Sequence, residues 1–463
     1  MPEKTQAELD WEALQIVLAR AVEANPRYPD AVRAAAIPHW FDAEILAALL
    51  GDDADAPALL TWLTQRPFVE RYGERAYALH ERTRDMLRSR LWADDRERFR
   101  DWSARVGEFY RKQLGEKAEP AELKGPHEAK LTAEEESLYA EIVYHRLIVD
   151  DAGGLLLFQQ AFLDAESTWK VTVCHLLVAG LREQMSLTGN YAPWLRHYEG
   201  RLLDQAQSWD EAAKAQREVL TQNVETKLRM WALAYLGIAS ISLGEFQAAV
   251  TSFEEALSLC REQSDLSDKG KILGYLGSAY LVQGLGQKAL AHFEASLRLR
   301  RELGDRVGEA GVVDSISQLY LLQGRWEEAL TLSEANLELW RELGYRERQG
   351  MTRSRIGNIY LAQGKQTAAQ TELNEAIKLL RSIESPEADK AADNAIVLLG
   401  FSRFRLSGCL SLLIRVNPLF EKLFGRATRR WLFQARAGRK GARAGEAYKK
   451  MIEMMREIGQ GKK

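Results

Sequence analysis

The sequence predicts a mainly α-helical protein: a superhelix of helical hairpins preceded by a small α+β module. Two observations predict the superhelix. Glycines recur every 40 residues, at Gly244, Gly284, Gly324 and Gly364, and a period of roughly 20–50 residues is the signature of stacked repeats. Apolar residues on both sides of each glycine follow helical spacing. A third observation predicts the module, because two aromatic and β-branched runs within 68–79 flank a glycine, as in a β-hairpin.

Residues 1–114 are expected to form the α+β module. Apolar residues at helical spacing predict a first helix over Ala7–Ala24, which Pro26 and Pro29 end. Asp42 precedes an apolar run and is expected to cap a helix from Ala43 to Leu50. The other helices expected in this module are Ala56–Gln65, His80–Trp92 and Arg96–Leu114.

Three stretches of this module resemble the winged helix that follows the nucleotide-binding domain of STAND-class signalling ATPases. They are Phe41–Gly51, Pro67–Glu70 and Leu79–Arg84. In that family a Met-His-Asp triplet lies here and its histidine contacts the phosphate of the bound nucleotide, whereas this chain has Leu79-His80-Glu81. The resemblance implies a winged-helix-like module with His80 as the candidate cofactor contact. The chain has no Gly-x-x-x-x-Gly-Lys-Ser/Thr phosphate loop, so no bound cofactor is expected.

Residues 115–131 lack apolar periodicity and are expected to be a linker. Helical pairs then resume over 132–227, outside the 40-residue register, and predict degenerate helical-hairpin repeats. The helices expected there are 134–147, 155–165, 169–185, 194–206 and 209–220.

Residues 228–385 hold four 40-residue repeats, each predicted to be a helix, a turn and a second helix. In the first repeat Trp231 and Tyr235 share one face of a helix. Gly244 ends that helix, because glycine readily adopts the left-handed conformation. A glycine in mid-helix, such as Gly277, costs about 1 kcal/mol relative to alanine. We expect it to be kept because it lets a second helix approach closely.

The repeat resembles the tetratricopeptide repeat, although it is longer than the usual length of about 34 residues and lacks the terminal proline. In the second unit the consensus is met by Leu276, Gly277, Tyr280, Gly284, Ala289 and Phe293. The resemblance implies a tetratricopeptide-like helical-hairpin superhelix, in which the first helices line a concave groove for a protein or peptide partner. It places the following residues in that groove: Trp231, Lys271, Ser278, Asp314, Gln318, Ser354 and Asn358.

Residues 386–463 are expected to form a C-terminal helical cap and a basic tail. Glycines at about the repeat interval predict a fifth first helix over 391–406, and the apolar residues after it are expected to cover the end of the repeat stack. The apolar run Ala395–Val416 is long enough to cross a membrane. Arg403 and Arg405 near its centre would each cost about 2.5–3.5 kcal/mol there, so no transmembrane segment is expected.

Charge is segregated along the chain. Residues 401–463 hold 16 Lys and Arg against 4 Asp and Glu, a balance of +12, in a chain whose net charge is −3. Three interpretations of the tail stay open: a solvated cationic face, contact with an anionic membrane surface, and nucleic-acid binding through phosphate contacts. The candidate residues for an anionic partner are Arg429, Arg430, Arg439, Lys440 and Arg443.

Composition favours a cytoplasmic globular protein. The chain has 463 residues, of which 46% are hydrophobic and 28% charged, and this fits two or three domains. The three cysteines Cys174, Cys260 and Cys409 are odd in number and far apart, so neither a disulfide framework nor a metal site is expected. The first residues lack the apolar core of a signal peptide.

The sequence does not favour catalysis. The seven histidines form no His-x-x-x-His pair, and the adjacent Cys174 and His175 would point about 100° apart on a helix. We predict a non-enzymatic protein-protein interaction scaffold or sensor, a STAND-type regulatory protein that lacks its own ATPase domain. Two alternatives stay open. One is a nucleic-acid- or membrane-associated regulator that uses the winged helix and the basic tail. The other is a nucleotide-responsive subunit of a split signalling ATPase, whose P-loop ATPase is separately encoded.

Overall fold

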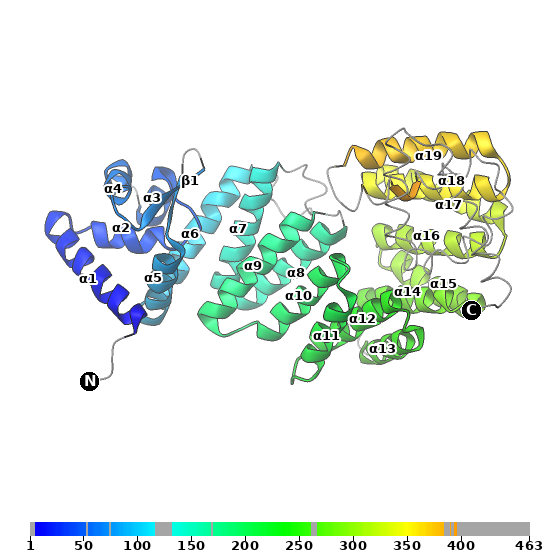
Figure 1. The fold of residues 1–463 in the computed structure, drawn as a ribbon, viewed down its shortest axis with the longest axis horizontal. Coiled ribbons are helices and arrows are strands. Elements are labelled where there is room, and N and C mark those ends of the chain that lie inside the picture. Colours follow the sequence, from blue (N-terminus) through cyan, green and yellow to red (C-terminus); the bar gives the residue numbers. More distant parts are fainter. Residues whose placement is uncertain are drawn as a thin grey trace, which may run out of the picture.

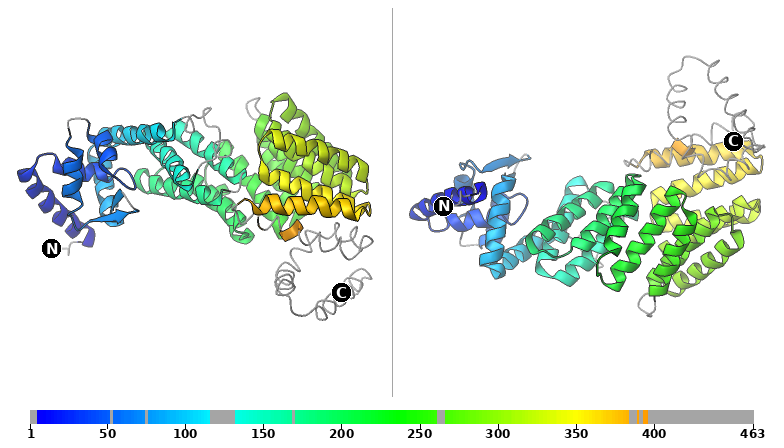
Figure 2. Two further views of the ribbon diagram at one scale, coloured as in Figure 1. Left: turned by 90° about the horizontal axis from the view of Figure 1, so that it is seen from above. Right: turned by 60° about the horizontal axis from the view of Figure 1, so that its bottom comes forward.

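In the computed structural model the chain forms an elongated stack of helices, with the N-terminal module at one end and the four long repeats at the other (Figures 1 and 2). The structure describes residues 5–51, 54–73, 76–115, 132–167, 170–260, 266–383, 389 and 393–395. One hydrophobic core runs from Leu14 in the module to Ala232 in the first long repeat. The module and the helices that follow it therefore pack as one continuous body. The predicted mainly helical superhelix is confirmed.

The N-terminal module contains six helices and one hairpin within its described residues. The helices are α1 (Gln6–Ala24), α2 (Tyr28–Ala35), α3 (Ala43–Leu50), α4 (Ala56–Leu63), α5 (Glu81–Asp94) and α6 (Arg96–Leu114). Strands β1 (Val69–Tyr72) and β2 (Ala76–Leu79) pair antiparallel, and the backbone of Phe41 adds a bridge to Tyr77. The predicted hairpin is confirmed. These two strands are only a weak indication of a winged helix.

Helix α2 is a correction to the sequence analysis, which placed no helix after Pro29. This proline lies in the first turn of α2. A proline is tolerated there, because the backbone N–H groups of a first turn have no partner within the helix. Pro29, Ala31 and Val32 are buried against the rest of the module, so tertiary packing stabilises this short helix.

Asp42 caps α3 as the sequence predicts: its Oδ1 accepts a hydrogen bond from the backbone N–H of Ile45 at 2.8 Å. We expect Asp42→Ala to lower the free energy of unfolding by about 1 kcal/mol, because one backbone donor at the helix start loses its acceptor. Urea denaturation measures the change. Asp42→Asn is the control, since asparagine keeps an acceptor at this position, and an alanine variant as stable as the asparagine variant would contradict the prediction.

The helices between the module and the long repeats are α7 (Ala133–Val149), α8 (Asp151–Ser167), α9 (Val171–Thr188), α10 (Ala192–Gln205) and α11 (Trp209–Leu220). Of these helices, α7 to α10 differ from the predicted ranges by one to four residues at their ends, whereas α11 has the predicted bounds. The largest difference is at the start of α8, which includes Gly153 and Gly154. A Cβ on Gly154 would lie 2.6 Å from the Cα of Leu147 in α7. Gly154 thus permits α7 and α8 to cross closely after a connection of one residue.

The four long repeats are helical hairpins, as predicted. Their first helices are α12 (Thr226–Leu243), α14 (Leu266–Val282), α16 (Arg306–Leu322) and α18 (Arg346–Ala362), and their second helices are α13 (Phe246–Leu259), α15 (Gly286–Glu302), α17 (Trp326–Glu342) and α19 (Gln366–Arg381). The glycine in each inter-helix turn has a positive φ, between 74° and 82°. A Cβ on Gly277 would lie 2.6 Å from the Phe293 ring, so the mid-helix glycine does permit close packing within a hairpin.

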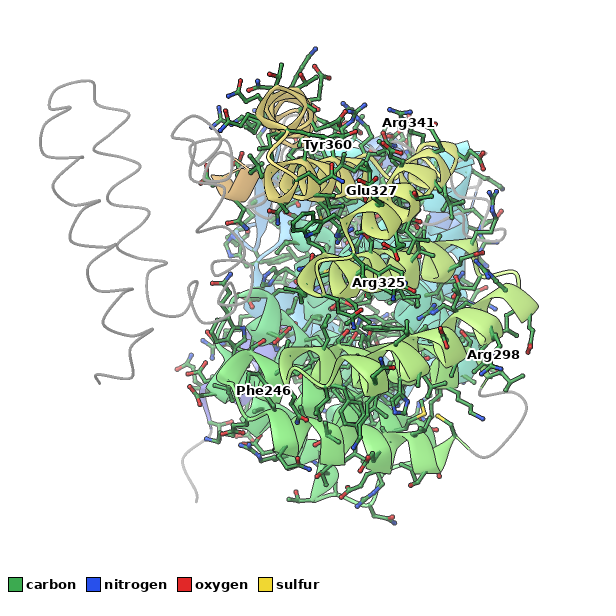
Figure 3. All side chains as sticks on the ribbon, turned by 90° about the vertical axis from the view of Figure 1, so that its right-hand side faces the viewer. Phe246, Arg298, Arg325, Glu327, Arg341 and Tyr360 are labelled. Carbon is green, nitrogen blue, oxygen red and sulfur yellow. The ribbon has the colours of Figure 1, made fainter. Side chains whose placement is uncertain are left out.

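The arrangement of the repeats makes the first-helix side the inner side of the curve. First helices of successive repeats touch one another directly, α12 with α14, α14 with α16 and α16 with α18. A surface groove of about 500 Å³ instead lies between the second helices α15 and α17, and Ile316 and Tyr320 of α16 line its floor. Arg325 and Glu327, labelled in Figure 3, lie at the rim of this groove.

The C-terminal predictions lie almost wholly outside the described residues. Residues 393–395 are helical, and Ala395 is fully buried against Leu361, Ala369 and Leu373 of the last repeat. The expected linker, the rest of the expected fifth first helix, the candidate span Ala395–Val416 beyond its first residue, and the basic tail are not described. Within the described segments, every helix is too short or too polar to cross a bilayer.

Candidate functional site

The candidate site is the inner surface formed by the first helices of the long repeats. Trp231, Lys271, Gly311 and Met351 occupy equivalent positions in successive repeats. The Lys271 ammonium lies 5.1 Å from the centroid of the Trp231 ring and 3.4 Å from Oδ1 of Asp268. Equivalent positions in the first two long repeats therefore meet in space on the first-helix side.

The centre of this groove has little side-chain bulk. A Cβ added to Gly311 would meet nothing within 4 Å. Sequence reasoning missed this glycine. The signal was present, because Gly311 is the repeat equivalent of Trp231 and Lys271. The surface of α16 at Gly311 thus has room for a partner's chain.

The polar groove residues are half-buried. Ser278 donates a hydrogen bond to the carbonyl of Gly274 at 3.1 Å, while Gln318 and Ser354 lie in the same layer with intermediate exposure. Asn358 is also half-buried, and its buried Oδ1 has no hydrogen-bond partner. This oxygen would have to turn toward the surface to accept a hydrogen bond from a bound chain.

Asp314 has a different environment from the other predicted groove residues. Its side chain accepts hydrogen bonds from Trp340 Nε1 at 3.2 Å and from the Thr352 hydroxyl at 3.3 Å, and it pairs with Arg355. Asp314 is 8% exposed. These contacts join α16, α17 and α18, so Asp314 acts as a structural acceptor between two repeats and is the least available of the seven positions for a partner.

A cluster that the sequence analysis did not identify lies next to the first long repeat. The Arg201 guanidinium pairs with Glu166 and lies 4.5 Å from the ring centroids of both Phe162 and Tyr235. Tyr235 in turn donates a hydrogen bond to Glu166 at 3.2 Å. These contacts connect α8, α10 and α12, and they fix the position of Tyr235 beside Trp231, whose ring lies 6.1 Å away.

A long-range contact connects the turn between α17 and α18 with α8. Tyr345, in the turn between α17 and α18, is 5% exposed. Burial raises its pKa to about 12, and the carboxylates of Asp164 and Glu347 act in the same direction, while a hydrogen bond with the Ser167 side chain opposes them. Asp164 and Ser167 belong to α8. The turn between α17 and α18 therefore contacts the last residues of α8.

His80 lies away from this inner surface. It is the residue before α5, its side chain is 48% exposed, and its Nε2 lies 3.9 Å from Oε2 of Glu70 in the hairpin. A carboxylate at this distance repels a phosphate. The local charge thus gives little support to His80 as a nucleotide contact.

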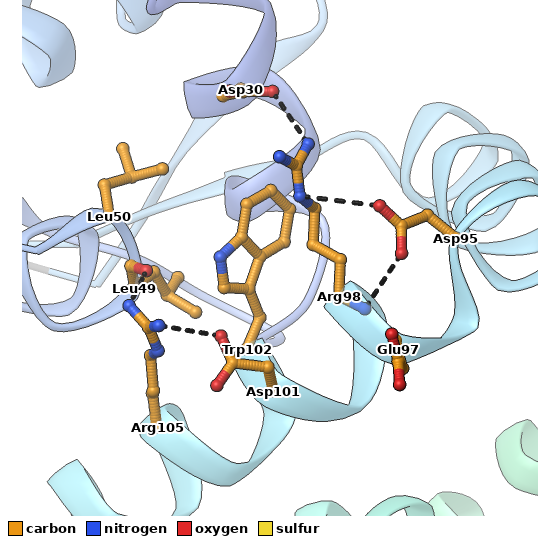
Figure 4. Close-up of a pocket in the computed structure, with 9 residues that line it drawn as sticks. All are labelled: Asp30, Leu49, Leu50, Asp95, Glu97, Arg98, Asp101, Trp102 and Arg105. Atoms are coloured by element: carbon orange, nitrogen blue, oxygen red, sulfur yellow. Dashed lines mark hydrogen bonds and ion pairs between the residues drawn. The ribbon is translucent and has the colours of Figure 1, made fainter.

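The module also has a surface groove of about 560 Å³ between α6 and the α2–α3 region (Figure 4). Arg98 lies 3.3 Å from Asp30 and 3.6 Å from Asp95, and Arg105 lies 2.8 Å from Asp101. The two arginines are neutralised by carboxylates of the module itself, so this groove is best explained as packing of α6 on its neighbours. No cluster of His, Cys, Asp and Glu in the described part of the chain could hold a metal ion.

Residues 229–262 and 311–382 match family models of the tetratricopeptide repeat. The chain therefore carries tetratricopeptide repeats, in the segment where the 40-residue period predicts them. A comparison with curated proteins finds no match.

Several solved structures are distantly similar. The crystal structure of a STAND protein with a tetratricopeptide repeat sensor from Pyrococcus horikoshii is 15% identical, with a TM-score of 0.42 over 93% of this chain and 67% of that chain. A Rap protein complexed with Competence and Sporulation Factor is 13% identical, with a TM-score of 0.44 over 81% of this chain and 98% of that chain. Aspartyl phosphate phosphatase F from Bacillus subtilis is 13% identical, with a TM-score of 0.44 over 77% and 92%.

Proposed function

We propose that this protein is a non-enzymatic interaction scaffold or sensor that binds a segment of a protein or peptide partner along the inner groove. The observations that support this best are the contact between the equivalent residues Trp231 and Lys271 and the open space beside Gly311, which has the same position in the third long repeat. Tetratricopeptide repeats are generally non-catalytic scaffolds, and these repeats match that family.

The groove suits an extended chain better than a compact ligand. Its surface at Gly311 has room for a chain, and Gln318, Ser354 and Asn358 supply side-chain donors and acceptors along its length. Side-chain amides can hydrogen-bond to the backbone of an extended peptide whatever its sequence. The aromatic and ionic group at Trp231 and Lys271 would then contribute specificity at one end.

We expect Gly311→Trp to abolish or strongly weaken partner binding while leaving the fold intact. A Cβ at this position meets nothing within 4 Å, so the indole fills the groove instead of the core. The measurement compares partners captured from the native host by the full-length wild-type and variant proteins, with circular dichroism to verify folding.

Two variants make this experiment decisive. Ala335→Trp adds the same indole to an exposed position on the second helix α17 and is expected to retain every partner. Gly311→Ala adds only a methyl group to the groove and is expected to retain most binding. A partner that binds Gly311→Trp and wild type equally well would place its binding surface outside the groove.

More specifically, we propose that the protein is a STAND-type regulator that lacks its own ATPase domain. The Leu79-His80-Glu81 stretch supports a winged-helix-like module, and the missing phosphate loop supports a regulator that works beside a separately encoded P-loop ATPase in the cytoplasm. Isothermal titration of the full chain with ATP and ADP should show no binding. Nucleotide binding that is lost in His80→Ala would instead favour the nucleotide-responsive subunit.

The basic tail favours a second candidate function, contact with nucleic acid or an anionic membrane surface. The balance of +12 over residues 401–463 supports it. The candidate residues Arg429, Arg430, Arg439, Lys440 and Arg443 lie outside the described residues. Deleting 436–463 should reduce binding to anionic vesicles or to nucleic acid, whichever the full chain binds, and this binding should weaken steeply with added salt.

A further inference from the structure

The N-terminal module meets the first helices of the array through a cluster of polar side chains, which we call the joint. His39 comes from the segment between α2 and α3, and the other members come from α5, α7 and α9. The joint consists of His39, Arg84, Arg88, Glu141, Tyr144 and Glu183. None of these residues takes part in the groove.

His39 contacts a carboxylate with each of its two ring nitrogens. Nδ1 lies 2.7 Å from Oε1 of Glu141 in α7, and Nε2 lies 2.8 Å from Oε1 of Glu183 in α9. A neutral imidazole has a single N–H, so it would direct a lone pair at one of these oxygens. The imidazolium form, with two N–H groups and a positive charge, suits both carboxylate neighbours. The two short contacts therefore favour a charged His39 when the joint is closed.

Glu183 has other cationic partners besides His39. Arg84 and Arg88 of α5 lie 3.0 and 2.6 Å from its Oε2, and the Tyr144 hydroxyl donates to the same oxygen at 3.1 Å. Arg84 also donates to the carbonyl of Pro38 at 3.0 Å, which holds the His39 segment against α5. Glu183 would therefore remain paired if His39 lost its proton.

Glu141 would not. Its side chain is 12% exposed, and its ion-pair neighbours in the described part of the chain are His39 and His145. His145 is 1% exposed and lies 3.6 Å away, and burial lowers its pKa, so it is neutral near pH 7. Tyr110 of α6 also faces this region, but burial raises the pKa of its hydroxyl well above the usual value. Neutral His39 leaves Glu141 as a buried carboxylate that has no ion-pair contact with a cation in the described part of the chain and only the longer-range attraction of Arg84, which is unfavourable.

We propose that His39 is a protonation-controlled latch, which tightens the packing of α5 and of the segment between α2 and α3 on α7 and α9 when charged and loosens it when neutral. The hydrophobic core that joins the module to the array remains in both states, so the latch controls how tightly the polar side of this contact is held. This pH-dependent control goes beyond partner binding itself.

The direction of the pH dependence follows from the surroundings of His39. Burial and the charge of Arg84 lower the pKa of His39. The charge of Glu141 and hydrogen bonds to Glu141 and Glu183 raise it, and the net pKa lies above the ordinary value of 6.5. A histidine with a raised pKa stabilises the closed state fully below its unperturbed pKa, and this stabilisation is lost as the pH rises through the raised value. The joint should therefore loosen on the alkaline side of neutrality.

Hydrogen exchange of the full-length protein at pH 6.5 and pH 9, corrected for intrinsic exchange rates, tests the latch. Protection of amides in α5 and α7 is expected to fall between the two pH values, by about tenfold for each unit by which the His39 pKa is raised. Peptides from α16, which lies far along the chain in the third long repeat, serve as the internal reference and are expected to change little.

Variants distinguish the latch from a general effect of pH. His39→Gln should show low protection of α5 and α7 at both pH values, whereas His80→Gln, an exposed histidine of the same module, should behave as wild type. Glu141→Gln should move the pH midpoint downward, because it removes a charge that raises the pKa of His39. The proposal would be overturned if protection of α5 and α7 in the wild-type protein did not change between pH 6.5 and pH 9, and this result does not depend on any variant folding. It would also be overturned if protection in His39→Gln changed with pH as it does in wild type.

Discussion

Glu183→Ala is expected to lower the free energy of unfolding by about 3–5 kcal/mol, the range for removing one partner from a buried ion pair. Arg84 and Arg88 have side chains that are 8% and 4% exposed, and both pair with Glu183. Without its carboxylate these two guanidinium groups stay buried and lose their principal anionic partner, which is more costly than the loss of the attraction itself. The change also removes the acceptor of the Tyr144 hydroxyl.

Urea denaturation followed by circular dichroism and tryptophan fluorescence measures this loss. The matched control is Glu328→Ala, which removes a carboxylate from an ion pair with Arg325 at 3.0 Å on the surface of the repeats. Exposed pairs contribute about 0–1 kcal/mol. Equal losses for the two variants would mean that burial of the joint has no energetic consequence, and would contradict the prediction.

Gly154→Ala is the second change with a large expected effect. An added Cβ would lie 2.6 Å from the Cα of Leu147 and 2.7 Å from the carbonyl oxygen of Arg146. These are backbone atoms of α7, which cannot rotate away as a flexible side chain would. The two helices must separate, and we expect a loss of about 3 kcal/mol, at the upper end of the range for overpacking.

Gly311→Ala is the control for this prediction, because it makes the same chemical change in another helix where the new methyl group meets nothing within 4 Å. There the higher helix propensity of alanine should leave stability unchanged or raise it by up to about 1 kcal/mol. The difference between the two variants, measured by thermal or urea denaturation, isolates the contact between α7 and α8. A Gly154→Ala protein as stable as Gly311→Ala would show that these helices can separate without loss.

Features that depend on neighbours in the chain could be predicted from the sequence. The 40-residue period gave the helical hairpins and the left-handed glycine of each turn, because a glycine that ends a helix acts within a few residues. Helices α3, α6 and α11 begin and end where the sequence predicts, and α3 also has the predicted capping residue, Asp42. The hairpin of β1 and β2 was predictable for the same reason, since a glycine turn joins two short runs that pair with each other.

Features that depend on which helices become neighbours required the tertiary structure. Pro29 suggests the end of a helix, yet it lies within α2, whose buried alanines pack on the module. Asp314 has the repeat position of a groove residue, but Trp340, Thr352 and Arg355 surround it. Nothing in the local sequence distinguishes such a residue from an exposed one.

The joint illustrates the same limit most clearly. His39 and Glu183 are 144 residues apart in the chain, and Arg84 and Glu183 are 99 apart. Each lies in an ordinary stretch of sequence, and their charges have meaning only after α5, α7 and α9 pack together. The sequence by itself determined the repeats and their turns, because these follow from local periodicity. The tertiary structure alone decided which polar side chains are buried together, because burial and pairing are set by contacts between distant helices.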